Sequence, residues 1–175
     1  MTADDPNLRQ TLSQAAAQMG VPLTEAHNTA LLAYMALIQK WNKVYNLTAL
    51  RDAPAMLTHH LLDSLAVIAP LQRQLQALYP AMQSSSERIR LLDVGSGAGL
   101  PGVVIAILCP EIRVDCVDTV AKKASFIQQV ALSLKLPNLR GVHARVENLT
   151  DKYQVVSSRA FASLVDFTTW SVNAL

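Results

Sequence analysis

The 175-residue sequence lacks the features that several classes of protein require. No apolar run reaches the length that crosses a membrane, and the acidic start, residues 1–6, differs from the basic start of a signal peptide. The two cysteines, Cys109 and Cys116, form no CxxC motif and lack histidines at metal-ligand spacing, so we expect no metal site. We interpret both thiols as small buried groups of a protein in a reducing compartment, the cytoplasm.

The sequence also has little net charge. Lys and Arg number 15 and Asp and Glu number 13, which gives a formal net charge of +2. This value is too small to indicate nucleic-acid binding by itself, although basic residues outnumber acidic ones from Arg113 to Arg159. Because 51% of the residues are hydrophobic, the chain can bury the core of one soluble globular protein.

The first half of the sequence predicts amphipathic helices. Apolar residues recur at helical spacing, and Gly20-Val21-Pro22 separates the first two helices. A polar stretch, residues 84–87, follows the last one and reads as a linker. We therefore expect a helical N-terminal extension over residues 1–83, with helices at residues 7–19, 24–41, 53–65 and 67–78.

Short apolar strands alternate with helices in the second half, which predicts parallel βαβ units and an α/β, Rossmann-like core over residues 88–175. A doubly wound sheet of this kind usually continues for about two or three more strands, so we expect C-terminal strands to be missing. We expect an inner strand left at the edge to promote self-association of this piece and to weaken its activity, whereas the complete protein is expected to be a monomer. Strands are predicted at residues 89–94, 113–117, 140–143 and 154–157, and helices at residues 101–108, 121–134 and from 165 onward.

A glycine-rich turn, Asp93-Val94-Gly95-Ser96-Gly97-Ala98-Gly99-Leu100-Pro101-Gly102, joins the first of these strands to its helix. A strand, a glycine-rich turn and a helix N-terminus form a nucleotide-binding corner, and a turn without any ligand is the alternative. The spacing Gly97-x-Gly99-x-x-Gly102 also fits a dinucleotide motif. However, a carboxylate at Asp93 repels a pyrophosphate and attracts the ammonium and sulfonium of S-adenosylmethionine. We therefore predict S-adenosylmethionine as the cofactor, in contact with Asp93, Gly95, Gly97, Gly99 and Leu100.

Three later strand ends supply further candidates for this site. Asp118 ends the second strand at the spacing of an acidic residue that binds ribose hydroxyls, and an exposed loop carboxylate is the alternative. Val146 and Glu147 follow the third strand, where they are expected beside an adenine, unless they form a plain surface loop. Arg159 follows the fourth strand and is a candidate for positioning a phosphate or a base edge, with a surface ion pair as the alternative.

Several motifs outside the glycine turn carry a more specific resemblance. They are Trp41-Asn42-Lys43-Val44-Tyr45-Asn46-Leu47-Thr48, His60-Leu61-Leu62-Asp63-Ser64, Lys122-Lys123 before Phe126, Arg145-Val146-Glu147 and Ser158-Arg159-Ala160-Phe161. Together with the glycine turn, over about residues 30–165, they resemble the RsmG (GidB) family of bacterial methyltransferases, which modify N7 of a guanine in 16S ribosomal RNA. The resemblance implies a class I S-adenosylmethionine-dependent methyltransferase fold. It also implies cofactor contacts at Gly95, Leu100, Asp118, Val146, Glu147 and Arg159.

The implied reaction needs no general base, because guanine N7 has an exposed lone pair and no proton to lose. The sequence shows no obvious base, so no catalytic residue is assigned beyond Arg159 as a candidate for substrate positioning. The implied partner is 16S ribosomal RNA or the small ribosomal subunit. Basic and aromatic side chains suit contact with RNA, and packing inside the protein or a solvated face is the alternative. The candidates are Lys40, Trp41, Lys43, Tyr45, Arg51, His59, His60, Lys122 and Lys123.

Two other functions stay open on the sequence alone. One is a class I methyltransferase that acts on a small molecule or a protein, and this function predicts little basic surface around the cofactor. The other is a nucleotide-binding or RNA-docking module without catalytic activity.

Overall fold

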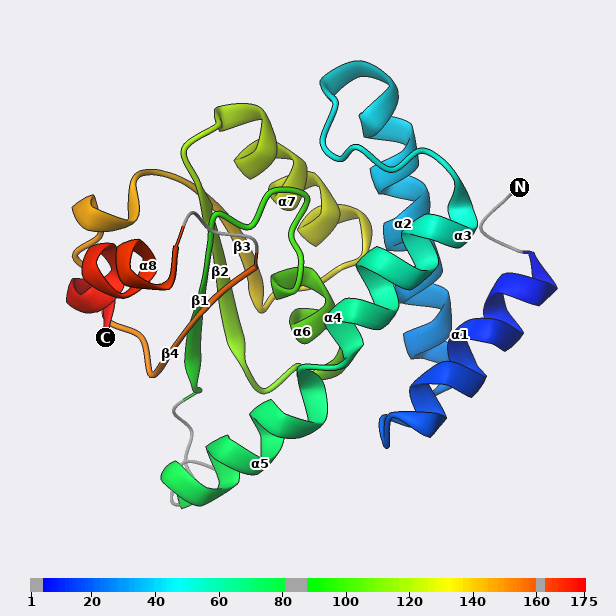
Figure 1. The fold of residues 1–175 in the computed structure, drawn as a ribbon, viewed down its shortest axis with the longest axis horizontal. Helices are drawn as coiled ribbons and strands as arrows, with labels where there is room; N and C mark the ends of the chain where they lie inside the picture. Colours follow the sequence, from blue (N-terminus) through cyan, green and yellow to red (C-terminus); the bar gives the residue numbers. More distant parts are fainter. Residues whose placement is uncertain (1–4, 81–87, 160–162) are drawn as a thin grey trace. The chain divides into compact units, whose positions relative to one another are not determined.

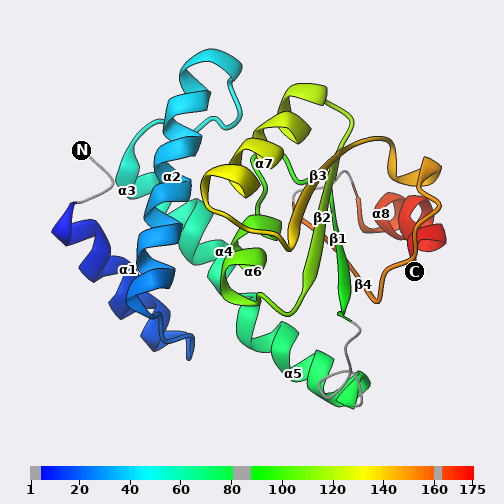
Figure 2. The ribbon, with the colours of Figure 1, turned by 180° about the vertical axis from the view of Figure 1, so that it is seen from behind.

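The computed structural model describes residues 5–80, 88–159 and 163–175. The chain divides into two compact units, Met1–Ser86 and Glu87–Leu175, which are described separately below (Figures 1 and 2). Within the described residues, no helix combines the length and the apolar character needed to span a bilayer.

Unit 1, residues 1–86, is helical, as its periodicity predicts. The second helix continues beyond the predicted end at residue 41, to Tyr45, and stops where Asn46 adopts the left-handed conformation (φ 49°). The third predicted helix contains a π-helical turn, which the spacing of apolar residues did not reveal. The elements are α1 (Pro6–Gln18), α2 (Glu25–Tyr45), α3 (Ala53–Met56), the π-turn η1 (Leu57–Leu62), α4 (Asp63–Leu65) and α5 (Ile68–Leu78).

The core of unit 1 forms where the apolar faces of α1, α2 and η1 meet. Helix α2 contributes the largest share, because its apolar residues recur every three or four positions and lie on one face. Burial of these side chains away from water provides most of the stability of a helical unit. The buried residues include Leu8, Leu12, Leu31, Leu32, Tyr34, Met35, Ile38, Leu57, Leu61 and Leu65.

Unit 2, residues 87–175, contains a four-stranded parallel sheet in the order β3-β2-β1-β4. The views in Figures 1 and 2 show α6 and α7 on one face of the sheet and α8 on the other. This arrangement confirms the predicted α/β, Rossmann-like class. The elements are β1 (Arg90–Val94), α6 (Gly102–Leu108), β2 (Arg113–Asp118), α7 (Ala121–Ser133), β3 (Leu139–His143), η3 (Val146–Asn148), β4 (Val155–Ser158), α8 (Leu164–Ser171) and η4 (Val172–Ala174).

A cluster of charged residues holds the amino-terminal half of the sheet together. Asp115 of β2 is fully buried and accepts hydrogen bonds from Arg140 of β3 (Nε 3.0 Å, Nη2 2.6 Å) and from the Tyr153 hydroxyl (2.9 Å). Arg90 of β1 lies over the Tyr153 ring at 4.7 Å, and Asp151 forms ion pairs with both arginines. Burial, then the neighbouring Asp115, raises the pKa of Tyr153 to about 12, so its hydroxyl keeps its proton and donates to Asp115.

Candidate functional site

The first strand connection of unit 2 places three glycines on alternate positions of a tight turn. Gly95, Gly97 and Gly99 have φ values of 65°, 59° and 92°, a region that residues with a side chain rarely adopt. The turn is fastened to β2, because the amide of Gly95 donates to the Val117 carbonyl at 2.9 Å. An added Cβ at Gly97 meets no atom closer than 4.0 Å, so this glycine is required for its backbone conformation.

Asp93, in the strand before this turn, has a different role from the one predicted. Its side chain is fully buried, with Oδ2 accepting from the Gly102 amide (2.9 Å) and Oδ1 from the Ser157 hydroxyl (3.0 Å). Burial raises its pKa to about 6, although the two hydrogen bonds and the nearby Arg159 charge oppose this shift. The side chain is enclosed and does not line the cavity described below, which corrects the expectation that Asp93 faces the cations of a ligand. The carboxylate instead ties the start of α6 to the sheet.

Asp118, at the end of β2, is held by backbone amides from two loops. Its side chain is 6% exposed, and it accepts from the amide of Gly97 (3.1 Å) and from the amide of Val120 (2.9 Å). The Lys123 ammonium lies 3.5 Å from Oδ2. The alternative of an exposed loop carboxylate is therefore wrong. The carboxylate fixes the glycine turn relative to the start of α7.

The same ion pair changes the interpretation of the two lysines that open α7. Lys123 was expected to contact RNA, but its ammonium is paired with Asp118, which compensates for a cation at a helix N-terminus. Lys122 is exposed, and it forms no hydrogen bond or ion pair within the described residues. Of these two lysines, only Lys122 is thus free for an external partner within the described residues.

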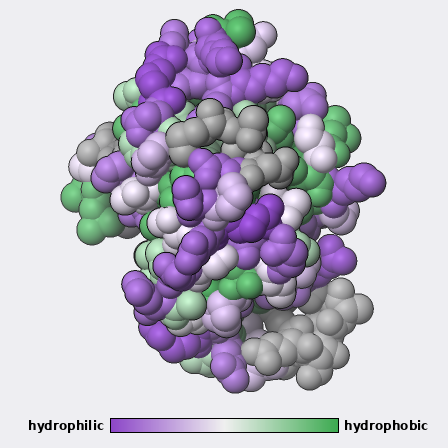
Figure 3. Space-filling view, turned by 90° about the vertical axis from the view of Figure 1, so that its right-hand side faces the viewer, coloured by the Kyte–Doolittle hydropathy of each residue, from purple (hydrophilic) through white to green (hydrophobic). Residues whose placement is uncertain are grey.

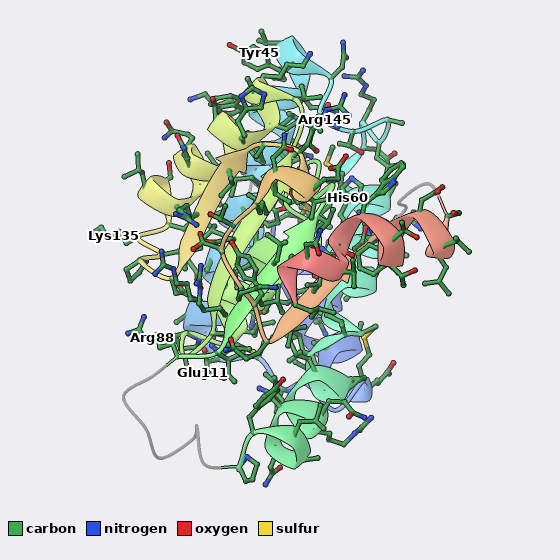
Figure 4. The ribbon with its side chains drawn as sticks, turned by 90° about the vertical axis from the view of Figure 1, so that its left-hand side faces the viewer. Tyr45, His60, Arg88, Glu111, Lys135 and Arg145 are labelled. Carbon is green, nitrogen blue, oxygen red and sulfur yellow. The ribbon has the colours of Figure 1, made fainter. Side chains whose placement is uncertain are left out.

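A cavity of about 490 Å³ opens at the carboxyl ends of β1, β2 and β3. In Figure 4, the label of Arg145, which follows β3, marks this end of the sheet, and the label of Arg88 marks the opposite end. The cavity brings together four of the predicted cofactor residues from three separate loops. Its lining consists of Val94, Gly95, Val117, Asp118, Thr119, Val120, Lys123, Ala144, Arg145, Val146, Glu147 and Trp170.

The remaining predicted cofactor residues do not line this cavity. Gly99 and Leu100 are buried, Gly97 is partly buried, and Asp93 is enclosed behind the turn. Arg159 is half-buried beyond the end of β4, on the side where its charge influences Asp93. Residues 160–162, which include part of the Ser-Arg-Ala-Phe motif, lie outside the described residues.

Trp170 is the aromatic residue of the lining, and the sequence did not predict it. It comes from α8, which packs against η3, and its side chain is 41% exposed. An indole beside Val146 provides a flat apolar wall, while Asp118 provides carboxylate oxygens for hydroxyl donors. The cavity can therefore hold a nucleoside. The sequence shows an aromatic residue in the last helix. Its position beside the loops that follow β1, β2 and β3 depends on tertiary structure.

The candidates in unit 1 range from buried to exposed side chains. His60 is 6% exposed, with Nε2 lying 2.8 Å from the Thr48 hydroxyl, so the prediction that it contacts RNA is wrong. His59 is exposed. Trp41 and Tyr45 stack at a tilt, with ring centroids 5.1 Å apart, and Tyr45 is 39% exposed (Figure 4). Lys40, Lys43 and Arg51 line a second cavity, within unit 1.

Comparison with known proteins identifies the family. The family described as GidB, rRNA small subunit methyltransferase G, matches residues 27–175. The ribosomal RNA small subunit methyltransferase G of Paracidovorax citrulli is 59% identical over 177 residues, which cover 100% of this chain and 73% of that protein. The corresponding protein of Albidiferax ferrireducens is 62% identical over 169 residues, covering 96% of this chain and 75% of that protein. A solved structure of coclaurine N-methyltransferase bound to N-methylheliamine and SAH matches with a TM-score of 0.45 and 14% identity, covering 90% of this chain and 49% of that one. This chain therefore belongs to the GidB family of rRNA small subunit methyltransferases.

Proposed function

We propose that this chain binds S-adenosylmethionine in the cavity of unit 2 and methylates N7 of a guanine in 16S ribosomal RNA, in the cytoplasm. The observation that carries the proposal is the set of residues that line this cavity. Membership of the chain in the GidB family supports it. A carboxylate, a glycine turn and an apolar wall converge there at the carboxyl ends of parallel strands. This is the end of an α/β sheet at which ligands bind.

The residues of the cavity fit a nucleoside cofactor. Asp118 uses one oxygen for Val120 and the other for Gly97 and Lys123, and each oxygen keeps lone-pair capacity for a ribose hydroxyl. Val146 and Trp170 offer apolar surface to an adenine, and Glu147 is exposed beside them. Gly95, at the mouth of the turn, lets the methionine portion approach the backbone. No pyrophosphate-binding lysine or arginine is needed in this scheme, in contrast to a dinucleotide.

When bound, S-adenosylmethionine would supply a methyl group on its sulfonium, and the bond from guanine N7 to that carbon would form in line as the C–S bond breaks, leaving S-adenosylhomocysteine. The protein then has to orient the base, exclude water and tolerate the charge that moves to the purine. No proton is removed from N7, so no general base is required. We assign Arg159 to positioning of the guanine, because it is half-buried beyond β4, next to the strand where the order of the sheet reverses.

Contact with the RNA is assigned to basic and aromatic residues, all of them exposed except Trp41, which is partly buried. These side chains can pair with phosphates or stack on unpaired bases. Lys123 is excluded from this set because its ammonium pairs with the Asp118 carboxylate, and His60 because its side chain is buried. The set consists of Lys40, Trp41, Lys43, Tyr45, Arg51 and Lys122.

The test is methyl transfer from labelled S-adenosylmethionine to small ribosomal subunits that lack the modification, followed by mapping of the labelled base. Label on N7 of one guanine is the expected result. Transfer to a small molecule or a protein instead supports the first rival function. Binding of S-adenosylhomocysteine without transfer to any of these supports a non-catalytic module. Calorimetry with S-adenosylhomocysteine and NADH separates the two cofactors, and tighter binding of NADH contradicts the proposal.

A further inference from the structure

The second cavity, within unit 1, carries three cations and no acidic lining residue. Its volume is about 520 Å³, and its lining is Ala36, Gln39, Lys40, Asn42, Lys43, Arg51 and Met56. Within the described part of the chain, neither lysine ammonium has a hydrogen bond or an ion pair. Asp52, the carboxylate next to Arg51 in sequence, accepts from the Ala55 amide at the start of α3. The face of unit 1 in Figure 3 is largely hydrophilic.

Asn42 creates this arrangement by folding the chain back after α2. Its side chain is only 2% exposed, with Nδ2 donating to the Leu50 carbonyl (3.0 Å) and Oδ1 accepting from the Thr48 amide (3.0 Å). The segment after the helix therefore returns alongside the last turn of α2. As a result, Arg51 reaches the same cavity as Lys40 and Lys43, although α3 begins only two residues later.

Arg51 is held in place by neutral partners. Its Nη1 donates to the Asn42 carbonyl (3.2 Å) and its Nη2 to the Asn46 side-chain oxygen (2.8 Å). A guanidinium has five N–H groups, so the remaining three are available to an acceptor from outside. Because both partners are neutral, neither of them offsets the positive charge of Arg51. An anchored guanidinium loses little side-chain entropy when it binds an anion.

We propose that this cavity is a binding site for a phosphodiester of the RNA backbone, with Arg51 as the fixed contact and Lys40 and Lys43 as mobile ones. Asn42 and Asn46 are positioning residues that present the guanidinium. A planar guanidinium matches phosphate geometry through two parallel hydrogen bonds. The choice of RNA over a free phosphate ion rests on the proposed function and on the stacked Trp41 and Tyr45 in the last turns of the same helix. This site explains why the Trp-Asn-Lys-Val-Tyr-Asn motif combines a lysine with the buried Asn42 and with Asn46, which anchors Arg51.

The charge of the site is tested with a labelled single-stranded uridine octamer, which contains no guanine and so cannot be a methylation substrate. We expect binding by the full chain to weaken with salt. In the triple variant Lys40→Gln, Lys43→Gln, Arg51→Gln, the slope of log K against log salt should fall by about 2, at roughly 0.7 per phosphate contact. Arg73→Gln, which removes an exposed cation of α5 outside the cavity, is the control and should leave the slope unchanged.

The positioning role is tested with variants that keep the charge. Asn46→Gly retains a residue suited to positive φ but removes the anchor of Arg51. We expect this variant to bind the octamer several-fold more weakly, with the same salt slope and the same melting temperature. Arg51→Lys should also keep the slope and lose affinity, because an ammonium lacks the planar fork.

Three results would overturn the proposal. One is an unchanged salt slope in the triple variant, and another is equal affinity for an octamer with uncharged methylphosphonate linkages. The third is binding of inorganic phosphate as tight as binding of the octamer, which would make the cavity a site for the free ion. S-adenosylhomocysteine affinity should stay constant in all variants. Failure of ribosomal RNA methylation with these binding results intact would count against the proposed function and leave this phosphodiester site standing.

Discussion

The two ends of the parallel sheet in unit 2 use carboxylates in opposite ways. In the amino-terminal half, Asp115 accepts from Arg140 and from the Tyr153 hydroxyl, so side chains close around it. At the carboxyl end, Asp118 accepts mainly from backbone amides and borders an open cavity. A carboxylate enclosed by side chains stabilises the fold, whereas one held by loop amides shapes those loops and can still bind a ligand. Substitutions at the two ends should therefore separate stability from cofactor affinity.

The largest expected effect is at the enclosed end. Asp115→Ala should lower the free energy of unfolding by about 3 kcal/mol, because it leaves Arg140 and the Tyr153 hydroxyl without their acceptor. Cofactor affinity in the variant should be retained under conditions where it is folded. Urea unfolding measures the loss. Asp151→Ala is the matched control, since that side chain is 47% exposed and surface ion pairs contribute less than about 1 kcal/mol. Equal losses in both variants would remove the distinction between a buried and an exposed partner.

The second prediction concerns Asp93, which is enclosed although it lies near the carboxyl end. Its pKa is raised to about 6 in the folded protein, so the folded state binds this proton more tightly than the unfolded chain does. The stabilisation from this group is complete below pH 3.8 and is lost as the pH rises through 6. Relative to Asp93→Asn, the free energy of unfolding should fall by on the order of 3 kcal/mol between pH 4 and 7. Unfolding of both proteins at several pH values measures it, and a constant difference between them contradicts the expectation.

The third prediction addresses the open end. Asp118→Ala should weaken S-adenosylhomocysteine binding by about 1–3 kcal/mol, because a charged acceptor is lost and the glycine turn is released from its amide contact. The fold should survive, since Asp118 contributes little to the apolar core. Calorimetry measures the affinity, with Glu111→Ala, an exposed carboxylate outside the cavity, as the control. An unchanged affinity would make Asp118 a purely structural residue like Asp115.

The smallest expected effect is at the apolar wall of the cavity. Trp170→Ala should weaken binding of S-adenosylhomocysteine by about 1 kcal/mol, the scale of one aromatic contact, and Trp170→Phe should recover most of it. The same titration should show adenosine affected and homocysteine unaffected. A loss shared by both fragments would place Trp170 away from the adenine.

The order of strands and helices could be predicted from the sequence. The role of a residue could not be predicted where it depends on the direction in which its side chain points. Alternating strands and helices predict the parallel sheet, and parallel strands bring their carboxyl ends to one edge, which is why the sequence could predict that Asp118 and Val146 lie close together. The same reasoning placed Asp93 near the ligand, but strand position does not say that its carboxylate turns toward α6 and Ser157.

Two residues in helical segments, His60 and Lys123, were also predicted to have roles that their side-chain contacts do not support. His60 follows Leu57 by three positions and precedes Leu61, and all three are buried, so helical spacing already favoured a core position over RNA contact. The pairing of Lys123 with Asp118 needed the distance between a strand end and the next helix. The position of Trp170 in the cavity could not be predicted, because no local sequence pattern relates α8 to the loops after β1, β2 and β3.

Trp41 and Trp170, the two tryptophans of the sequence, lie in different units, which gives the protein a built-in pair of optical reporters. The indole of Trp41 stacks on Tyr45 in unit 1, and that of Trp170 borders the cavity of unit 2. With Trp41→Phe, the tryptophan emission of the chain comes from unit 2 alone, and with Trp170→Phe from unit 1 alone. The unfolding of each half can then be followed separately in the intact chain, without attaching a dye.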